Sequence, residues 1–317
     1  MIRVSIPATT ANLGPGFDCI GLALNLRNTF SVVLDGEPGE VRVTVQGEGE
    51  QKLPHDKKHL VAQTMIDETW PGVMPQDRGI HIHCENAIPV ASGLGSSSTA
   101  LLAGLIFSSA LSARSVVGDD PIEIAKTVQS EVNMSRVLKR AIKLEGHGDN
   151  VAPALLGGLI LVVPDDEVIV RRVEFAPQRV VVCVPDFDFL TTVARAALPV
   201  EYPKADTIFN IGHVTLLVEA LRTGDADLLR SAVRDKVHEP YRLPLIPGAK
   251  EARQAAIDAG AITTCMSGAG PGQLAFASEN HEQIGQAMVQ AFAGAGLKAR
   301  SWILDAVTEG TSVFASN

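Results

Sequence analysis

Apolar and polar residues alternate with a period of two in several short segments of the chain, a pattern typical of half-buried strands. These segments are residues 2–6, 29–34, 40–46 and 79–85. Two apolar runs, 155–163 with its paired glycines and 179–184, predict strands that are buried on both faces. The turn-forming residues 35–39 lie between two of the alternating segments, and they predict a hairpin of strands 29–34 and 40–46.

Apolar residues at helical spacing predict helices in both halves of the chain. The predicted helices are residues 58–70, 120–132, 135–144, 204–223, 247–259 and 282–293, and short strands are predicted at 262–266, 273–277 and 297–304. This mixture indicates an α+β fold in which helices cover one face of a sheet. A change of composition at residues 164–167 predicts a domain boundary, which divides the chain into residues 1–163 and 164–317.

The stretch 89–100, PVASGLGSSSTA, has the composition of a phosphate-binding loop. It follows the strand 79–85 and leads into the apolar run 101–106, which predicts a buried helix. Glycines let a backbone approach a ligand closely, and the unpaired N–H groups of a first helical turn attract anions. The loop lacks the lysine of a Walker A motif, and Ser98 stands where a dinucleotide fingerprint has its third glycine. The alternative is a helix start whose small residues only pack tightly against a sheet.

Two further stretches carry polar side chains at junctions between elements. Residues 7–18 form a loop after the first strand that contains Asn12 and Asp18, which either face a cleft or satisfy their own backbone. Residues 145–150 bring glutamate, histidine, aspartate and asparagine together just before a buried strand. Such a mixture is typical of a site that holds metal and substrate.

Composition narrows the class of protein. The 317 residues include 27 basic and 36 acidic ones, a net charge of −9 with no long basic run, which argues against nucleic acid as the main partner. The four cysteines form no Cys-x-x-Cys pair, so a reducing compartment fits better than a disulfide framework or a zinc site. The N-terminus has no signal-peptide pattern and no uncharged apolar run is long enough for a membrane span, so we expect a cytoplasmic protein without a membrane partner.

Several of these stretches resemble the GHMP kinases, a family of small-molecule kinases. The phosphate loop fits the family pattern Pro-x-x-x-Gly-Leu-Gly-Ser-Ser, and residues 267–272 resemble the third, glycine-rich motif of the family. Residues 7–21, PATTANLGPGFDCIG, and 145–153 resemble the homoserine kinase branch in particular. The resemblance implies an N-terminal domain like a ribosomal-protein α/β fold, a C-terminal ferredoxin-like domain, an active site between them and a homodimer.

The resemblance also implies an activity: ATP-dependent phosphorylation of the side-chain hydroxyl of L-homoserine to O-phospho-L-homoserine, in threonine biosynthesis. It assigns Ser97 and Glu145 to Mg²⁺ and leaves open whether Asp149 is a general base or only orients the hydroxyl. The residues that it places around homoserine are Asn12, Asp18, His147, Asp149, Arg195 and Arg242. The residues that it assigns to the nucleotide phosphates are Pro89, Val90, Ala91, Ser92, Gly93, Leu94, Gly95, Ser96, Ser97, Ser98 and Thr99.

Two departures from the family pattern and two alternative functions belong to this prediction. Gly148 and Gly272 stand where the family commonly has proline and serine, and we expect both glycines to loosen their loops. One alternative is another GHMP-type kinase with a different small-molecule acceptor. The other is a nucleotide-binding protein of the same fold that no longer transfers phosphate.

Overall fold

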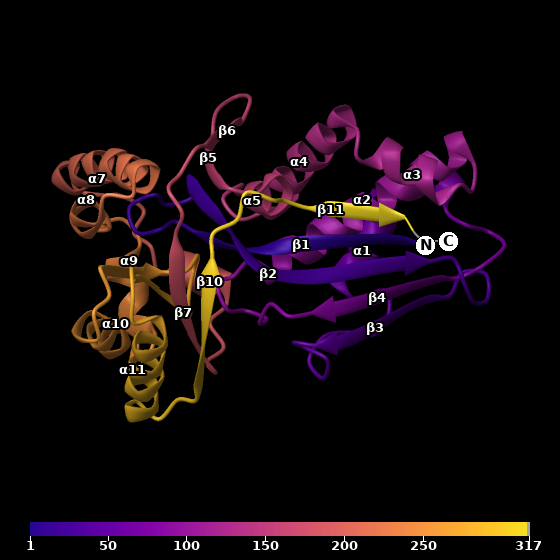
Figure 1. The fold of residues 1–317 in the computed structure, drawn as a ribbon. Coiled ribbons are helices and arrows are strands. Elements are labelled where there is room, and N and C mark those ends of the chain that lie inside the picture. The colour runs from indigo at the N-terminus through magenta and orange to yellow at the C-terminus, as the bar shows by residue number, and fades with distance from the viewer. Residues whose placement is uncertain (316–317) are drawn as a thin grey trace.

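The computed structural model describes residues 1–315 and contains two β-sheets with helices packed on them (Figure 1). The first sheet consists of β1 (Ile2–Ala11), β2 (Ile20–Val33), β3 (Val41–Gly47), β4 (Ile80–Asn86), β5 (Leu159–Val163), β6 (Ile169–Val173) and β11 (Ser312–Ala315). The second sheet consists of β7 (Arg179–Pro185), β8 (Thr263–Met266), β9 (Gln273–Phe276) and β10 (Ala299–Asp305). The predicted α+β class is confirmed.

The long strand β2 organises the first sheet. It pairs with β1 along most of its length, and its other edge carries β5 at Ile20–Leu22 and β4 at Thr29–Val33. The strand order is β11-β1-β2-β4-β3, with β6 paired to β5. β1 and β2 run toward the second sheet, where β2 also pairs with β5, and they carry the loop of residues 12–19 to the meeting point of the two sheets (Figure 1).

The predicted hairpin of residues 29–34 and 40–46 is wrong. β4 lies between β2 and β3, and β3 pairs with β4 in parallel. The turn at 35–39 instead holds the entry to β4, since Asp35 N–H donates to the carbonyl of Gly79 and Gly79 N–H donates to that of Gly36. The central position goes to the strand with the more completely buried side chains, Ile80, Ile82 and Cys84, which no rule on turn residues reveals.

Helices cover one face of the first sheet. They are α1 (Leu60–Glu68), α2 (Ser96–Val117), α3 (Pro121–Val128), α4 (Glu131–Glu145) and α5 (Val151–Leu156). Within residues 1–315, only α2 is long and apolar enough by composition to cross a membrane, but 67% of that segment is buried, with Leu102 and Phe107 fully enclosed. It is the core helix of this half of the molecule.

The second sheet has the strand order β10-β7-β9-β8. In chain order this is 4-1-3-2 with helical crossovers, the ferredoxin-like arrangement that the resemblance implied. The elements between β7 and β8 are α6 (Thr191–Ala196), α7 (Lys204–Thr223), α8 (Ala226–Ala232), α9 (Glu239–Arg242) and α10 (Ala249–Asp258), and α11 (His281–Gly294) joins β9 to β10. Two short 3₁₀ turns lie at Pro71–Val73 and Leu243–Leu245.

Alternate residues of β7 join the two halves of the molecule. Val181 and Cys183 pack in a core with α10 and α11, whereas Val180 and Val182 share a core with Leu22 of β2 and with side chains of α7 and α8. The two sheets are therefore joined by continuous apolar packing, not only by the chain. Residues 164–167 form the turn between β5 and β6, and β6 and β11 both belong to the first sheet. The division at residue 163 stays a prediction.

We expect Phe107→Ala to destabilise the protein by about 3–5 kcal/mol, because it leaves a cavity beneath the first sheet. The free energy of unfolding from urea titration of the ligand-free protein measures this. Val116→Ala, on the same helix but at a side chain that is 82% exposed, serves as the control, with an expected change within about 0.5 kcal/mol. Equal effects of the two substitutions would show that α2 is not the core helix.

Candidate active site

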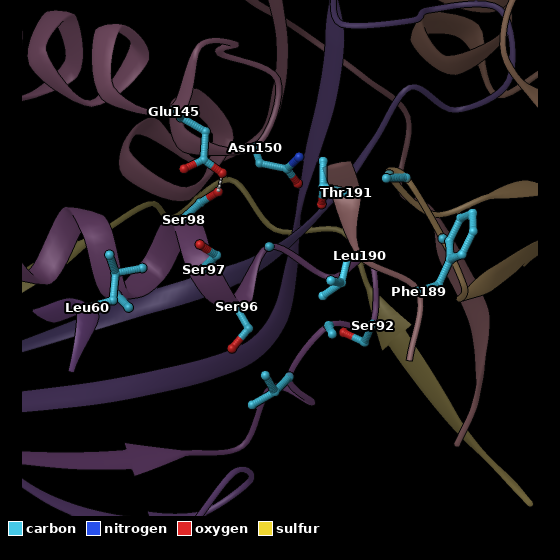
Figure 2. Close-up of a pocket in the computed structure, with 18 of the residues that line it drawn as sticks. Leu60, Ser92, Ser96, Ser97, Ser98, Glu145, Asn150, Phe189, Leu190 and Thr191 are labelled. Carbon is cyan, nitrogen blue, oxygen red and sulfur yellow. Dashed lines mark hydrogen bonds between the residues drawn. The ribbon is translucent and has the colours of Figure 1, made fainter. Parts of the chain in front are cut away.

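A cavity of about 340 Å³ lies between the start of α2 and the segment that joins β7 to α6. Figure 2 shows serines 96–98 on one side and Phe189, Leu190 and Thr191 on the other. The predicted catalytic and substrate-binding residues all line it: Asn12, Asp18, Ser97, Glu145, His147, Asp149, Arg195 and Arg242. The fold thus brings together side chains that are far apart in the sequence, and both sheets contribute to the walls.

Two glycines shape the phosphate loop. Gly93 and Gly95 have φ of 79° and 72°, in the left-handed region that favours glycine. A Cβ atom at Gly93 would lie 2.1 Å from the carbonyl oxygen of Ser267, and one at Gly95 would lie 2.2 Å from Thr9 Oγ1. Gly95 is the N-cap of α2 and offers no side-chain cap, so the N–H groups of the first turn stay available to an anion.

The third glycine-rich stretch is bonded directly to this loop. Ser267 Oγ is hydrogen-bonded to the carbonyl of Gly93 at 2.7 Å and to Thr10 Oγ1 at 2.9 Å. Gly272 N–H donates to the carbonyl of Ser92 at 3.2 Å, and a Cβ at Gly272 would lie only 2.4 Å from that oxygen. The expectation that Gly272 loosens its loop is wrong, because the missing side chain is what permits this close contact.

Gly148 shows the same effect. A Cβ there would lie 2.6 Å from Val162 Cγ1 and 3.3 Å from the side chain of Ile142. The glycine therefore allows the 145–150 stretch to pack closely between α4 and β5, and the expectation of a looser loop is wrong here too.

Three of the predicted phosphate-binding residues do not line the cavity. Leu94 is fully buried and its carbonyl accepts from the N–H of Thr9, which fixes the loop to β1. Thr99 is buried inside α2 and accepts from Asn28 Nδ2, and Pro89 lies along a neighbouring groove. The rest of the predicted stretch, residues 90–93 and 95–98, faces the cavity.

Glu145, the last residue of α4, reaches the start of α2. Its Oε1 accepts a hydrogen bond from Ser98 Oγ at 3.1 Å, whereas Ser97 is exposed and lines the same cavity (Figure 2). Among residues 1–315, no hydrogen bond engages the second carboxylate oxygen, Oε2. Glutamate and serine oxygens at a phosphate loop are a donor set suited to Mg²⁺, which prefers oxygen ligands and usually keeps several waters.

His147 and Asp149 form a buried pair. His147 Nδ1 lies 2.7 Å from Asp149 Oδ1, and the Asp149 side chain is 2% exposed. Burial lowers the pKa of His147, but the hydrogen bond to Asp149 and the charge of that carboxylate outweigh it, so the pKa lies above its ordinary value. One atom each of Asp18, His147 and Asp149 lie within 4.8 Å of one another. This corner of the cavity favours a positively charged group.

Arg195 forms an ion pair with Asp18. Two parallel hydrogen bonds of 2.9 and 2.8 Å join its guanidinium to the carboxylate, and these bonds raise the pKa of Arg195. Asn12 holds the same loop, since its Oδ1 accepts from Asp18 N–H at 2.9 Å and its Nδ2 donates to the carbonyl of Gly268 at 2.8 Å. Asn12 therefore serves the backbone, whereas Asp18 faces the cavity.

Arg242 is nearly enclosed and is not paired with a carboxylate. Its side chain is 1% exposed, yet no carboxylate of residues 1–315 lies within ion-pair distance of it. Its Nε donates to the carbonyl of Ala194 at 3.1 Å, and its guanidinium lies 5.1 Å from the centre of the Phe17 ring. Burial lowers the pKa of Arg242, and the charge of Arg195 adds to this effect. A guanidinium in this state is a strong receptor for an anion from outside the protein.

A second part of the cavity is apolar and carries two polar atoms without partners. Phe30, Leu53 and Leu60 line it together with His59 and Asn86. His59 Nε2 and Asn86 Oδ1 are buried and have no hydrogen bond within residues 1–315. Burial lowers the pKa of His59 to about 4, so the ring is neutral near pH 7. Since His59 Nδ1 accepts from Val61 N–H, Nε2 carries the proton and is a free donor.

Sequence reasoning missed this second part and the wall of residues 189–191. Asn150 lines the cavity and accepts from Thr9 Oγ1 at 2.8 Å. It belongs to the polar stretch 145–150, and this position was a signal that could have identified it. His59 caps α1 from just before its first residue, a place where serine, threonine, aspartate and asparagine are the usual signals. No motif pointed to Phe189 or Leu190, because apolar wall residues resemble any other buried residue in sequence.

Comparison with known proteins gives one answer. Residues 58–158 match the family described as GHMP kinases N terminal domain, and residues 217–294 match the one described as GHMP kinases C terminal. The chain is 39% identical over 316 residues to the homoserine kinase of Desulfitobacterium hafniense, a match that spans 99% of this chain and 100% of the relative. It is 38% identical over 316 residues to that of Synechococcus sp., spanning 98% and 97%.

Solved structures agree. The crystal structure of homoserine kinase from Cytophaga hutchinsonii superposes with a TM-score of 0.78 at 28% identity, covering 99% of this chain and 97% of that one. Full-length similarity in sequence and fold, together with a glycine loop of the family type at the cavity, leads to one conclusion. The chain belongs to the GHMP kinase family, in its homoserine kinase branch.

Proposed function

We propose that this chain transfers the terminal phosphoryl group of ATP to the side-chain hydroxyl of L-homoserine and forms O-phospho-L-homoserine. Use of ATP follows from membership of the GHMP kinases. The observation that carries the choice of acceptor is the charge pattern of the cavity. A buried, unpaired guanidinium at Arg242 and the carboxylates of Asp18 and Asp149 line the same space, next to the phosphate loop.

This charge pattern matches an amino acid. A zwitterion offers a carboxylate to Arg242, which has no ion-pair partner within the described residues, and an ammonium group to the carboxylate of Asp18. Arg195, held by Asp18, then contributes through the position of that carboxylate and through its own charge. Galactose and other uncharged sugars leave Arg242 unpaired, which favours homoserine over the sugar substrates of other GHMP kinases.

The nucleotide fits along the rest of the cavity. Residues 90–93 and 95–98 face it with backbone N–H groups and serine hydroxyls, which suits the phosphates. The apolar part with His59 and Asn86 suits the base, because a free donor and a free acceptor are what a nucleobase edge requires. With no lysine among the lining residues of the described chain, positive charge for the phosphates has to come from elsewhere.

Mg²⁺ is the second part of the proposal, with Glu145 and Ser97 as its protein ligands. The free Oε2 of Glu145 and the exposed hydroxyl of Ser97 fit this role, and Ser98 fixes the other carboxylate oxygen. When bound, the ion supplies the positive charge that offsets the phosphates. Phosphoryl transfer has a loose transition state, so the main task of the protein is to position the two substrates.

Asp149 is placed to orient the hydroxyl of homoserine. Its Oδ1 is held by His147, and no hydrogen bond within residues 1–315 engages its Oδ2. His147 thereby fixes the rotamer of Asp149 and keeps the second oxygen for substrate.

We further propose a homodimer in the cytoplasm, on the strength of the family resemblance. Analytical ultracentrifugation tests the dimer.

A coupled assay for ADP tests the proposed activity. We expect turnover with L-homoserine and Mg²⁺-ATP, and much less with mevalonate, galactose or L-serine. Mevalonate has a carboxylate for Arg242 but no ammonium group for Asp18, galactose has neither, and L-serine is one carbon too short. A higher rate with mevalonate or galactose would favour another GHMP kinase. Silence with every acceptor would favour the nucleotide-binding protein without transferase activity.

We expect Arg242→Gln to raise the KM for homoserine at least about tenfold, since a hydrogen bond to a charged group contributes about 1.5–3 kcal/mol. The KM for ATP should stay within about twofold. Arg234→Gln, at an exposed arginine that does not line the cavity, is the matched control. An unchanged homoserine KM in Arg242→Gln would place the substrate carboxylate elsewhere.

We expect Glu145→Gln to raise the Mg²⁺ concentration for half-maximal activity at least about tenfold and to lower kcat, because the amide keeps the bond to Ser98 but loses the charge. A Mg²⁺ titration at saturating ATP measures this. Glu123→Gln, an exposed glutamate paired with Lys126, should behave as the unmodified protein. An identical Mg²⁺ dependence in both variants would remove Glu145 from the metal site.

We expect His59→Ser to raise the KM for ATP about 2–10-fold, the loss of one neutral hydrogen bond, while the KM for homoserine stays constant. Serine keeps a cap for α1 and removes only the ring. Because the pKa of His59 is about 4, the effect should be the same at pH 6 and pH 8. His55→Ser, an exposed neighbour, is the control. Equal ATP KM values for the two variants would contradict binding of the ATP nucleobase at His59.

A further inference from the structure

His238 lies directly behind the cavity, at the N-cap of α9, and none of the functional assignments above uses it. Its side chain is completely buried. We propose that His238 is a positioning residue for homoserine, whose imidazole fixes Arg242 relative to the loop that carries Asp18. The inference rests on the proposed function, because it assumes that Arg242 binds the carboxylate of the substrate.

Both ring nitrogens have partners, and these partners define one tautomer. His238 Nε2 lies 2.8 Å from the carbonyl oxygen of Gly14, which only accepts hydrogen bonds, so Nε2 carries a proton. His238 Nδ1 lies 3.4 Å from Arg242 Nη1, which only donates, so Nδ1 is an acceptor without a proton. The ring therefore connects a main-chain carbonyl of the β1–β2 loop to the guanidinium, and Asp235 Oδ2 lies 3.7 Å from Nε2 on the loop-facing side of this connection.

An aromatic ring from the same loop reinforces this connection. Phe17 stacks on the His238 ring, with 5.2 Å between centroids and 23° between planes, and Arg242 lies over the same Phe17 ring. Phe17 directly precedes Asp18 in the chain. His238 and Arg242 thus contact the loop at Gly14 and Phe17, just before Asp18, and the distance between the two ends of the proposed substrate site depends on these contacts.

The main chain around His238 is itself held firmly. The carboxylate of Asp235 accepts hydrogen bonds from the N–H groups of Val237, His238 and Glu239 at 2.7–3.1 Å. Glu239 in turn forms a buried, two-bond ion pair with Arg253 and accepts from Met266 N–H. A ring that served only to fill space would need neither of its nitrogens; here one nitrogen contacts the guanidinium that faces the substrate.

Two isosteric substitutions separate the two bonds. In His238→Gln the side-chain amide N–H reaches the position of Nε2 and keeps the bond to Gly14, but nothing accepts from Arg242. In His238→Asn the Oδ1 atom takes the position of Nδ1 and keeps the bond to Arg242, but the side chain does not reach Gly14. His213→Gln is the control, since His213 is half-buried, contacts the carbonyl of Ala232 and lies outside the cavity.

The measurements are KM for homoserine, KM for ATP, kcat and Tm for the full-length chain. We expect His238→Gln to raise the homoserine KM at least about fivefold with an ATP KM within twofold, and His238→Asn to raise it less, although both variants lower Tm. His213→Gln should leave both KM values unchanged. Asparagine removes more side-chain volume than glutamine, so lost packing alone would raise the homoserine KM more in His238→Asn. A larger rise in His238→Gln is therefore accounted for by the lost bond to Arg242.

Two results overturn the inference. One is a homoserine KM in His238→Gln equal to that of the unmodified chain. The other is an equal rise of both KM values in the two isosteres, which is the signature of a purely structural residue. Failure of the proposed function is a separate result, because it is seen in the unmodified chain. That chain would then neither turn over L-homoserine nor bind it in calorimetry. In that case the inference fails with it.

Discussion

The direct contact between the phosphate loop and the 267–272 loop is the constraint on which the site depends. Ser267 binds the carbonyl of Gly93 and the hydroxyl of Thr10, and Gly272 binds the carbonyl of Ser92. A side chain at Gly93 or Gly272 would overlap a backbone oxygen of the opposite loop. The anion-binding turn is therefore shaped by both sheets at once, and neither half of the molecule forms the cavity alone. Each hydrogen bond adds only about 0.5–1.5 kcal/mol, so the close fit matters more than the strength of any one bond.

The charges around the cavity show what a phosphate loop without lysine still needs in order to bind a triphosphate. Three carboxylates, Asp18, Glu145 and Asp149, face two guanidinium groups, Arg195 and Arg242, and no lysine lines the cavity within the described residues. The walls carry no surplus of positive charge to offset a triphosphate. The helix dipole of α2 and its first N–H groups favour an anion, and the Mg²⁺ proposed at Glu145 would add the remaining positive charge.

Sequence patterns predicted the local features well and the long-range ones poorly. The glycine loop and the polar stretch before β5 correspond to elements of the structure, because glycine and helical periodicity act over a few residues. The ferredoxin-like half was implied by the family resemblance, not by these patterns. The hairpin of 29–34 and 40–46 was wrong because strand order depends on which strand buries most side chains. The hydrogen bond from Ser98 to Glu145 was not predicted, since the direction of a helix N-terminus decides which serine faces α4. His59 and Asn86 were invisible, as a missing hydrogen-bond partner is a property of three-dimensional packing.

The two arginines show how burial assigns roles that sequence leaves equal. Both lie in stretches of the family type, and a carboxylate is a suitable partner for either. Arg195 is partly exposed and already forms two parallel hydrogen bonds with Asp18. A substrate carboxylate would therefore have to compete with this ion pair. Arg242 is buried and contacts a carbonyl, an imidazole and an aromatic ring, while the carboxylates of Asp18 and Asp235 act on its charge only from beyond ion-pair distance. A buried charge that lacks a counter-ion destabilises the empty protein and binds an incoming anion correspondingly well. The fixed surroundings of Arg242 matter because they keep the guanidinium buried. If the side chain could rotate into water, its charge would be solvated and its affinity for an incoming anion would fall.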